Sequence, residues 1–229
     1  MAEEYTEYFR KISRRRPAPG VYTAGGEFIP CEKTSCMFSH GRKTFVSAGF
    51  LPAGSCAVVP EGVTGIGYGA FYGSDASSVI LPDTLRTVGE SAFQRAKVSS
   101  VHFGPGLVSV GTYAFAHSGL VSAVLPPSVR SIGFSAFRGC RGLVSAVIPE
   151  CASAGRFVFA ECGCLTAVSA AVPKDGASGG GQCMFSGCSS LAAASLRTDG
   201  ELPAKFFEGC GTLGSFLYRG GFAASAENV

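Results

Sequence analysis

Apolar and polar positions repeat along this chain with a period of about 22 residues. From residue 63 to residue 218, a phenylalanine that follows a small or apolar residue returns seven times, at Phe71, Phe93, Phe115, Phe137, Phe159, Phe185 and Phe207. Subtracting neighbouring numbers gives steps of 22, 22, 22, 22, 26 and 22 residues. A repeat of this length is typical of a solenoid, in which each repeat forms one coil and shields its neighbours.

Other positions keep phase with the phenylalanine. Four residues before it stands a glycine, which suits either a positive φ or a close backbone contact: Gly67, Gly89, Gly111, Gly133, Gly155 and Gly181. After it comes an apolar triplet such as Leu120/Ala123/Leu125, whose last two members have the two-residue period of a strand. Proline often closes this strand, as at Pro126. We therefore expect each coil to contain a strand, a proline turn, a second short apolar segment and a brief helical turn that carries the phenylalanine.

The full pattern, Leu-Pro-x5-Ile/Val-Gly-x2-Ala-Phe-x2-Cys-x2-Leu, is complete in residues 125–143. It resembles the BspA-type, or treponemal-type, leucine-rich repeat. The resemblance covers residues 63–218 and is weaker at 151–155, at the 26-residue step and at 202–207. It implies a leucine-rich-repeat solenoid with a sheet on one face and short helical or 3-10 turns. Proteins of this type are mostly non-enzymatic binding modules, and several are surface adhesins.

The remaining sequence suggests two terminal segments, so that the chain divides into residues 1–62, 63–218 and a tail at 219–229. Tyr5, Tyr8, Phe9 and Ile12 have helical spacing and predict an amphipathic helix over residues 3–14. We interpret this helix as a cap on the first coil, and the alternative is a docking helix for a partner or a membrane surface. Residues 21–29 predict a hairpin, and residues 21–60 an irregular first coil or two.

Composition limits the function classes. The chain has 229 residues, of which 46% are hydrophobic and 15% charged, and a net charge of +3. This small charge argues against nucleic-acid binding, and no window approaches the roughly 18 apolar residues of a membrane span. The first residues lack the apolar core of a secretory signal. They predict a cytoplasmic protein, and the alternative is a cell-surface or periplasmic protein whose export signal lies outside this sequence.

The cysteines are the main candidates for chemistry, and four of the ten stand three residues after a ladder phenylalanine: Cys140, Cys162, Cys188 and Cys210. We interpret these as structural, since a small side chain at such a turn can donate weakly to a neighbouring backbone. Cys162 and Cys164 also form a candidate redox pair. The only cluster that resembles a set of zinc ligands is Cys31, Cys36, His40 and Cys56, which would form a tetrahedral structural site.

No enzymatic function is predicted, and no cofactor is implied. The histidines do not sit in a recognisable nucleophile motif, and residues 176–181 are rich in glycine but lack the lysine of a phosphate-binding loop.

Strand alternation predicts a binding face instead. The outward strand positions are uncharged, and they include Ile80, His102, Ser122, Val124, Ser145, Val147, Ser169, Ser195 and Leu217. On a sheet that faces solvent, the outward positions normally carry polar or charged residues. This uncharged band therefore predicts contact with another protein or with a second copy of the chain. The alternative is that small residues simply suit a tightly curved face.

Overall fold

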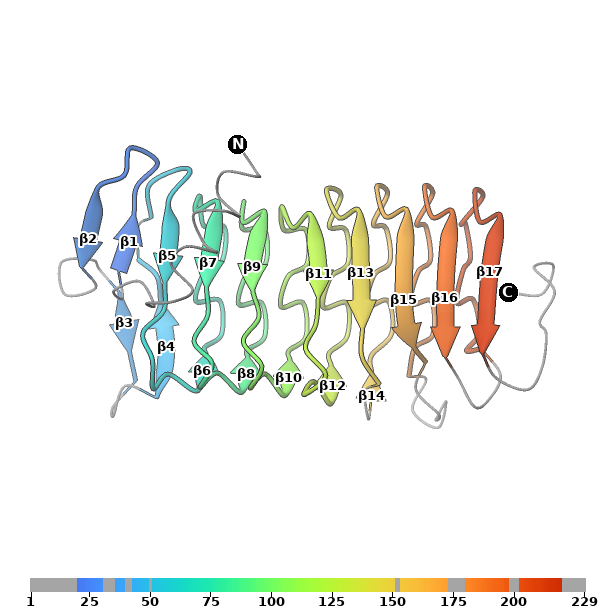
Figure 1. The fold of residues 1–229 in the computed structure, drawn as a ribbon, viewed down its shortest axis with the longest axis horizontal. Coiled ribbons are helices and arrows are strands. Elements are labelled where there is room, and N and C mark those ends of the chain that lie inside the picture. The colour runs from blue at the N-terminus through green and yellow to red at the C-terminus, as the bar shows by residue number, and fades with distance from the viewer. Residues whose placement is uncertain are drawn as a thin grey trace.

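The chain winds into a solenoid whose coils stack along one axis, as Figure 1 shows. The computed structural model describes residues 20–30, 36–39, 43–49, 51–150, 153–172, 180–197 and 202–219. Within these ranges every regular element is a strand. The expected solenoid with strands on one face is therefore confirmed. The amphipathic helix predicted over residues 3–14 lies outside the described residues.

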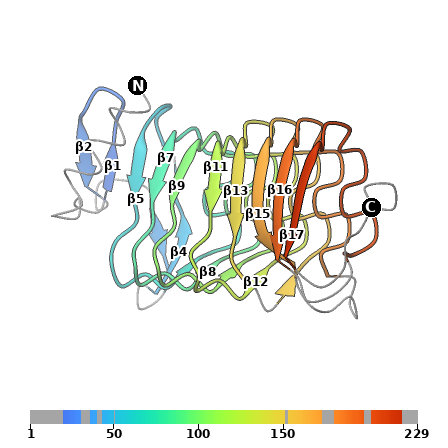
Figure 2. The same cartoon turned by 45° about the vertical axis from the view of Figure 1, so that its right-hand side comes forward.

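One face of the solenoid, the front face, carries two five-stranded sheets (Figures 1 and 2). The first front sheet has the order β2-β1-β5-β7-β9, with β1 at Gly20–Tyr22, β2 at Phe28–Pro30, β5 at Cys56–Val58, β7 at Ser78–Ile80 and β9 at Ser100–His102. The second has the order β11-β13-β15-β16-β17, with β11 at Ser122–Val124, β13 at Ser145–Ile148, β15 at Ala167–Ala171, β16 at Ala193–Arg197 and β17 at Ser215–Arg219. All pairs from β5 onwards within these sheets are parallel, because each strand begins a new coil.

The front face is thus interrupted between β9 and β11. At this point the coils remain joined by a hydrogen bond from the amide of Val121 to the carbonyl oxygen of Ser99, 3.1 Å away. The interruption coincides with Phe103, whose ring packs edge-on against Phe115 at 5.6 Å.

A third sheet forms the lower edge of the solenoid in Figure 1 and contains the second apolar segment of each coil. Its order is β14-β12-β10-β8-β6-β4-β3, with β3 at Met37–Phe38, β4 at Thr44–Ser47, β6 at Gly65–Ile66, β8 at Thr87–Val88, β10 at Ser109–Val110, β12 at Ser131–Ile132 and β14 at Ser153–Ala154. Most of these strands have two residues. In β8, β10, β12 and β14 one residue of each pair is buried, as in Val88, Val110 and Ile132.

The first strands of both faces pair antiparallel. β1 pairs with β2, which confirms the hairpin expected over residues 21–29, and β1 also pairs antiparallel with β5. In the lower sheet, β3 pairs antiparallel with β4. At the N-terminal end of the described solenoid, the strands therefore pair antiparallel instead of parallel.

The ladder phenylalanines form a continuous stack in the interior. The ring centroids of Phe71, Phe93, Phe115, Phe137 and Phe159 lie 4.6 to 5.1 Å apart, with interplanar angles of 1° to 7°. All five rings are buried. Phe45 adds a further ring, 5.0 Å from Phe71, upstream of residue 63, at which the sequence repeat begins. The repeat period thus follows from one aromatic ring per coil at the spacing of parallel strands.

The prediction of a brief helical turn around each phenylalanine is wrong. The residues two before and two after the phenylalanine adopt a left-handed φ; in the coil of Phe93 these are Ser91 at 54° and Arg95 at 59°. A right-handed helix cannot continue through such residues. Instead, the amides of Ser91, Phe93 and Arg95 donate to carbonyl oxygens of the next coil, at residues 112, 114 and 116. The turns therefore form a third line of hydrogen bonds between coils, in addition to the front sheets and the lower sheet.

Candidate binding surface

The candidate zinc ligands are only partly described. Cys56 is buried in β5, and the thiol of Cys36 donates to the carbonyl oxygen of Ala48 at 3.6 Å. Cys31 and His40 lie outside the described residues, so the zinc site stays a prediction. Among the residues that the structure describes, no three His, Cys, Asp or Glu side chains are placed to hold a metal ion.

The four ladder cysteines form a column, in which Cys140, Cys162 and Cys188 are buried and Cys210 is half-buried, and each thiol donates to the carbonyl oxygen of the phenylalanine one coil earlier. The S···O distances are 3.0 Å from Cys140 to Phe115, 3.2 Å from Cys162 to Phe137, 3.1 Å from Cys188 to Phe159 and 3.1 Å from Cys210 to Phe185. The structural role predicted for them is confirmed. Hydrogen bonding to the neighbouring thiols of Cys140 and Cys188, together with burial, holds the pKa of Cys162 well above its ordinary value of 9.0. Cys162 is therefore a neutral packing group, because only a thiolate is reactive.

The candidate redox pair is not arranged as one. Cys162 is buried in this column, whereas Cys164 is exposed, and both are free thiols.

The predicted outward residues are not equally open on the two front sheets. In the first, Ile80 is half-buried and its neighbour Ser78 is buried, whereas His102 is exposed. In the second, Ser145 is half-buried, and the exposed positions are Ser122, Val124, Val147, Ser169 and Ser195. The side chain of Leu217 lies outside the described part of the structure. The open part of the predicted band therefore begins at β9 and is continuous from β11 to β16.

Four exposed valines lie on or directly before β11 and β13, and we call them the valine patch: Val121, Val124, Val144 and Val147. Their exposed fractions are 47%, 59%, 45% and 41%. Val124 and Val147 are direct partners in the sheet, and the amide of Val144 donates to the carbonyl oxygen of Val121 at 2.8 Å. The hydroxyl groups of Ser122 and Ser145, on the same two strands, hydrogen-bond to each other at 3.3 Å. The polar atoms within the patch thus already have partners.

Strand alternation did not find Val121 and Val144. Each follows the buried ladder leucine directly, at the corner where the chain enters the strand, so the two-residue period assigns it to the interior. The useful signal was the apolar residue next to Leu120 and Leu143 in both coils. Beside the patch, β15 and β16 present only small outward side chains up to the exposed Arg197, namely Ala167, Ser169, Ala193 and Ser195.

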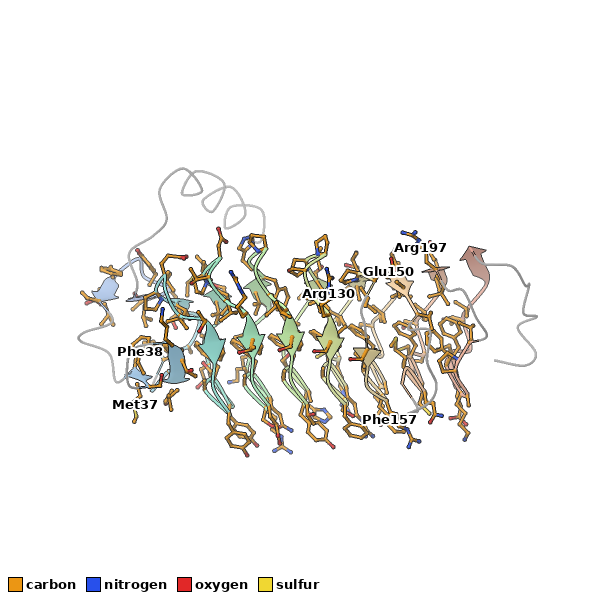
Figure 3. The ribbon with its side chains drawn as sticks, turned by 90° about the horizontal axis from the view of Figure 1, so that it is seen from below. Met37, Phe38, Arg130, Glu150, Phe157 and Arg197 are labelled. Atoms are coloured by element: carbon orange, nitrogen blue, oxygen red, sulfur yellow. The ribbon has the colours of Figure 1, made fainter. Side chains whose placement is uncertain are left out.

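A second surface, which the sequence analysis did not identify, lies along the edge formed by the phenylalanine turns. The partly exposed rings of Tyr113, Phe134 and Phe157 follow one another across three coils, with centroids 5.4 and 5.8 Å apart and nearly perpendicular planes. The guanidinium groups of Arg138 and Arg156 lie over the Phe157 ring, 5.7 and 5.5 Å from its centroid. In Figure 3, Phe157 lies on the opposite side of the solenoid from Arg197.

No helix long and apolar enough to cross a membrane occurs in the described ranges between residues 20 and 219. No curated protein sequence matches the chain. The family model for the BspA type leucine-rich repeat region matches residues 64–191 and 108–224, with six copies.

Three solved structures have similar folds. The leucine-rich repeat protein TpLRR of T. pallidum is 24% identical with a TM-score of 0.61, and the alignment covers 86% of this chain and 99% of that one. A leucine-rich repeat protein of Bacteroides ovatus is 25% identical with a TM-score of 0.56, over 69% of this chain and 47% of that one. The pneumococcal vaccine antigen PcpA is 15% identical with a TM-score of 0.54, over 75% and 42%. The chain thus spans all of the first relative and less than half of the other two.

Proposed function

This chain belongs to the BspA-type leucine-rich repeat family, and on that premise we propose that it is a non-enzymatic module that binds a protein through the outward face of β11–β16. The valine patch is the observation that carries the proposal. Its four valines are between 41% and 59% exposed; Val124 and Val147 are partners on adjacent strands, and Val121 and Val144 directly precede those strands. Contiguous apolar surface of this kind on a soluble fold marks a contact site.

The chemistry of the face favours a protein as its partner. From Ser122 to Ser195 the outward strand positions carry no charge, and the cores of protein interfaces are likewise depleted in charged residues. Small side chains on β15 and β16 leave this part of the face without large projections. A partner with a flat or slightly projecting apolar surface can therefore come close to the backbone beside the valines.

Two kinds of partner fit this chemistry. One is a different protein, which would include a host or matrix protein if the chain is an exported adhesin. The other is a second copy of the chain, packed face to face with its own valine patch. Cytoplasmic and cell-surface locations lead to different partners, and fractionation of intact cells with an antibody against the chain separates them.

The test is the double substitution Val124→Asp and Val147→Asp, which places two charges in the centre of the face. We expect binding to weaken by roughly 100-fold or more, since a buried unpaired charge costs several kcal/mol. The control is Val108→Asp, because Val108 is also exposed, at 38%, but directly precedes β10 of the lower sheet. Light scattering measures self-association, affinity capture from native lysate identifies other partners, and far-ultraviolet circular dichroism monitors the fold.

Loss of binding in the double variant but not in Val108→Asp supports the proposal. Retention of the same partners by the double variant would show that the front face is not the interface.

A further inference from the structure

The edge of the phenylalanine turns carries an excess of positive charge. Arg138, Arg141 and Arg156 lie in two adjacent coils, and Glu161 is the carboxylate with which Arg138 forms an ion pair. Three arginines and one carboxylate leave a local excess of two positive charges, against +3 for the whole chain. Arg141 and Arg156 are exposed.

His117 adds to this cluster from the preceding coil. Gly139 has no side chain, and a Cβ atom there would lie 2.4 Å from Nδ1 of His117, so the imidazole lies across this glycine. His117, Arg138 and Arg141 all attract the Glu161 carboxylate. Groups from different coils therefore lie close enough to Glu161 to act on the same region of the surface.

The partly exposed aromatic rings lie beside these charges. Tyr113, Phe134 and Phe157 provide one ring per coil across three coils, and two arginines contact the third ring. Apolar ring surface alternating with guanidinium groups suits a ligand that has both C–H surface and anionic groups. Guanidinium groups bind carboxylates and sulfates through paired hydrogen bonds.

The spacing of the coils selects the kind of polymer. Parallel strands repeat at about 4.8 Å, and the centroids of the rings on this edge lie 5.4 and 5.8 Å apart. An extended peptide advances about 3.3 Å per residue and presents the same face only every second residue, at about 6.6 Å. One pyranose unit of an extended glycan spans nearly the same distance as that between two neighbouring coils along the axis. A glycan along the axis can therefore place successive sugars over successive coils.

We infer that the edge formed by Tyr113, Phe134, Phe157, Arg138, Arg141 and Arg156 binds a linear acidic polysaccharide, with one sugar unit per coil. This surface lies across the solenoid from Arg197 on the front face (Figure 3), so the inference is independent of the proposed protein interface.

The experiment measures binding of oligogalacturonates of two to six units to the full chain by calorimetry. We expect the dissociation constant to fall with length up to about three units, the number of coils that carry the rings, and then to level off. The fully methyl-esterified oligomer, which has the same shape but no charge, should bind at least roughly ten-fold more weakly, because it lacks the carboxylates that the arginines would bind.

The variant is Arg141→Gln combined with Arg156→Gln, and we expect about ten-fold or greater loss of affinity. Arg197→Gln is the matched control for the single variant Arg141→Gln, since it removes one charge from an exposed side chain on the front face, across the solenoid from Phe157. The single variant Arg141→Gln changes one exposed residue and is a control for the case in which the double variant does not fold. It should show a smaller loss in the same direction.

Four outcomes would overturn the inference. These are no binding of any acidic oligomer, equal binding of the esterified oligomer, equal or tighter binding of oligoglutamate, and equal or tighter binding of a single-stranded oligodeoxynucleotide. The last two would show that the edge responds to negative charge alone or prefers another polymer.

Discussion

The coils of Phe71, Phe93 and Phe115 and the four coils that follow are built on the same period but are tied together differently. In the first group the next ladder position comes five residues after the phenylalanine, as at Leu120 after Phe115, and the next phenylalanine comes 17 residues later. In the second group the ladder leucine comes six residues after the phenylalanine; 16 more lead to the next phenylalanine, as from Leu143 to Phe159, except across the 26-residue step, where Leu165 is followed by 20. Outside that step the total of 22 is kept, because the path from the ladder leucine to the next phenylalanine is one residue shorter.

The extra residue accompanies the cysteine. In the cysteine coils the thiol donates to the phenylalanine carbonyl oxygen of the preceding coil. Ala96 occupies the equivalent position of an earlier coil, and its side chain has no hydrogen-bond donor. The aromatic stack shows the opposite trend. Neighbouring rings lie at most 5.1 Å apart from Phe45 to Phe159, but the separation rises to 5.7 Å between Phe159 and Phe185, across the 26-residue step. Close ring contacts thus join the coils up to Phe159, whereas the thiol hydrogen bonds begin with Cys140 and continue beyond the 26-residue step, where the ring contacts are longer.

The largest expected effect comes from removing a ring on each side of this step. Phe115→Ala should lower the free energy of unfolding by roughly 3–5 kcal/mol, as for other buried phenylalanines. Phe185→Ala should cost about 1 kcal/mol less, because its contact with Phe159 is longer and aromatic pairs contribute only about 0.5–1.5 kcal/mol. Urea denaturation compares the two. A greater loss for Phe185→Ala would refute the ranking of the two regions.

An intermediate effect is expected from moving the thiol. Cys162→Ala removes a buried hydrogen bond and some volume, and should destabilise the chain by about 1–3 kcal/mol. Ala96→Cys places a thiol at the equivalent position of an earlier coil, which lacks the extra residue. Ala96 is 1% exposed, so overpacking should cost about 1–3 kcal/mol as well. If Ala96→Cys is neutral or stabilising in thermal unfolding, the extra residue is not what makes room for the thiol.

The smallest effect concerns the ion pair at the turn edge. The hydrogen bond from Arg138 lowers the pKa of Glu161 below its ordinary value of 4.5, against the effect of partial burial and with help from the charges of Arg138, His117 and Arg141. A carboxyl whose folded pKa is lowered stabilises the fold above its unfolded pKa, and this contribution disappears as pH falls through the folded pKa. The Glu161 side chain is 53% exposed, so the contribution should be only about 0.2–1 kcal/mol.

Glu161→Gln tests this contribution in a cysteine coil without changing the thiol column. The stability difference between the variant and the parent chain should be present at pH 7 and should shrink towards pH 3. A difference that grows as the solution becomes more acidic would contradict the assigned sign.

The sequence by itself determined the solenoid, the stacked interior and the role of the ladder cysteines. A side chain that recurs at one place in every coil meets its own copies when the coils stack, so a ladder such as Phe93, Phe115 and Phe137 specifies its contacts without knowledge of the coordinates. The outward direction of Val124 and Val147 followed in the same way from the period of a strand.

Only the tertiary structure decided what depends on the distance between neighbouring coils. The ladder glycines are one example: a Cβ atom at Gly133 would lie 2.4 Å from the backbone nitrogen of Thr112, so glycine is required there by close contact with the preceding coil. The left-handed residues beside each phenylalanine likewise serve hydrogen bonds to the next coil, which no pattern within one coil reveals. The interruption after β9 and the cluster of His117, Arg138 and Arg156 also join residues about 20 positions apart. Their neighbours are set by how the coils pack, whereas the repeat records only the order of residues within each coil.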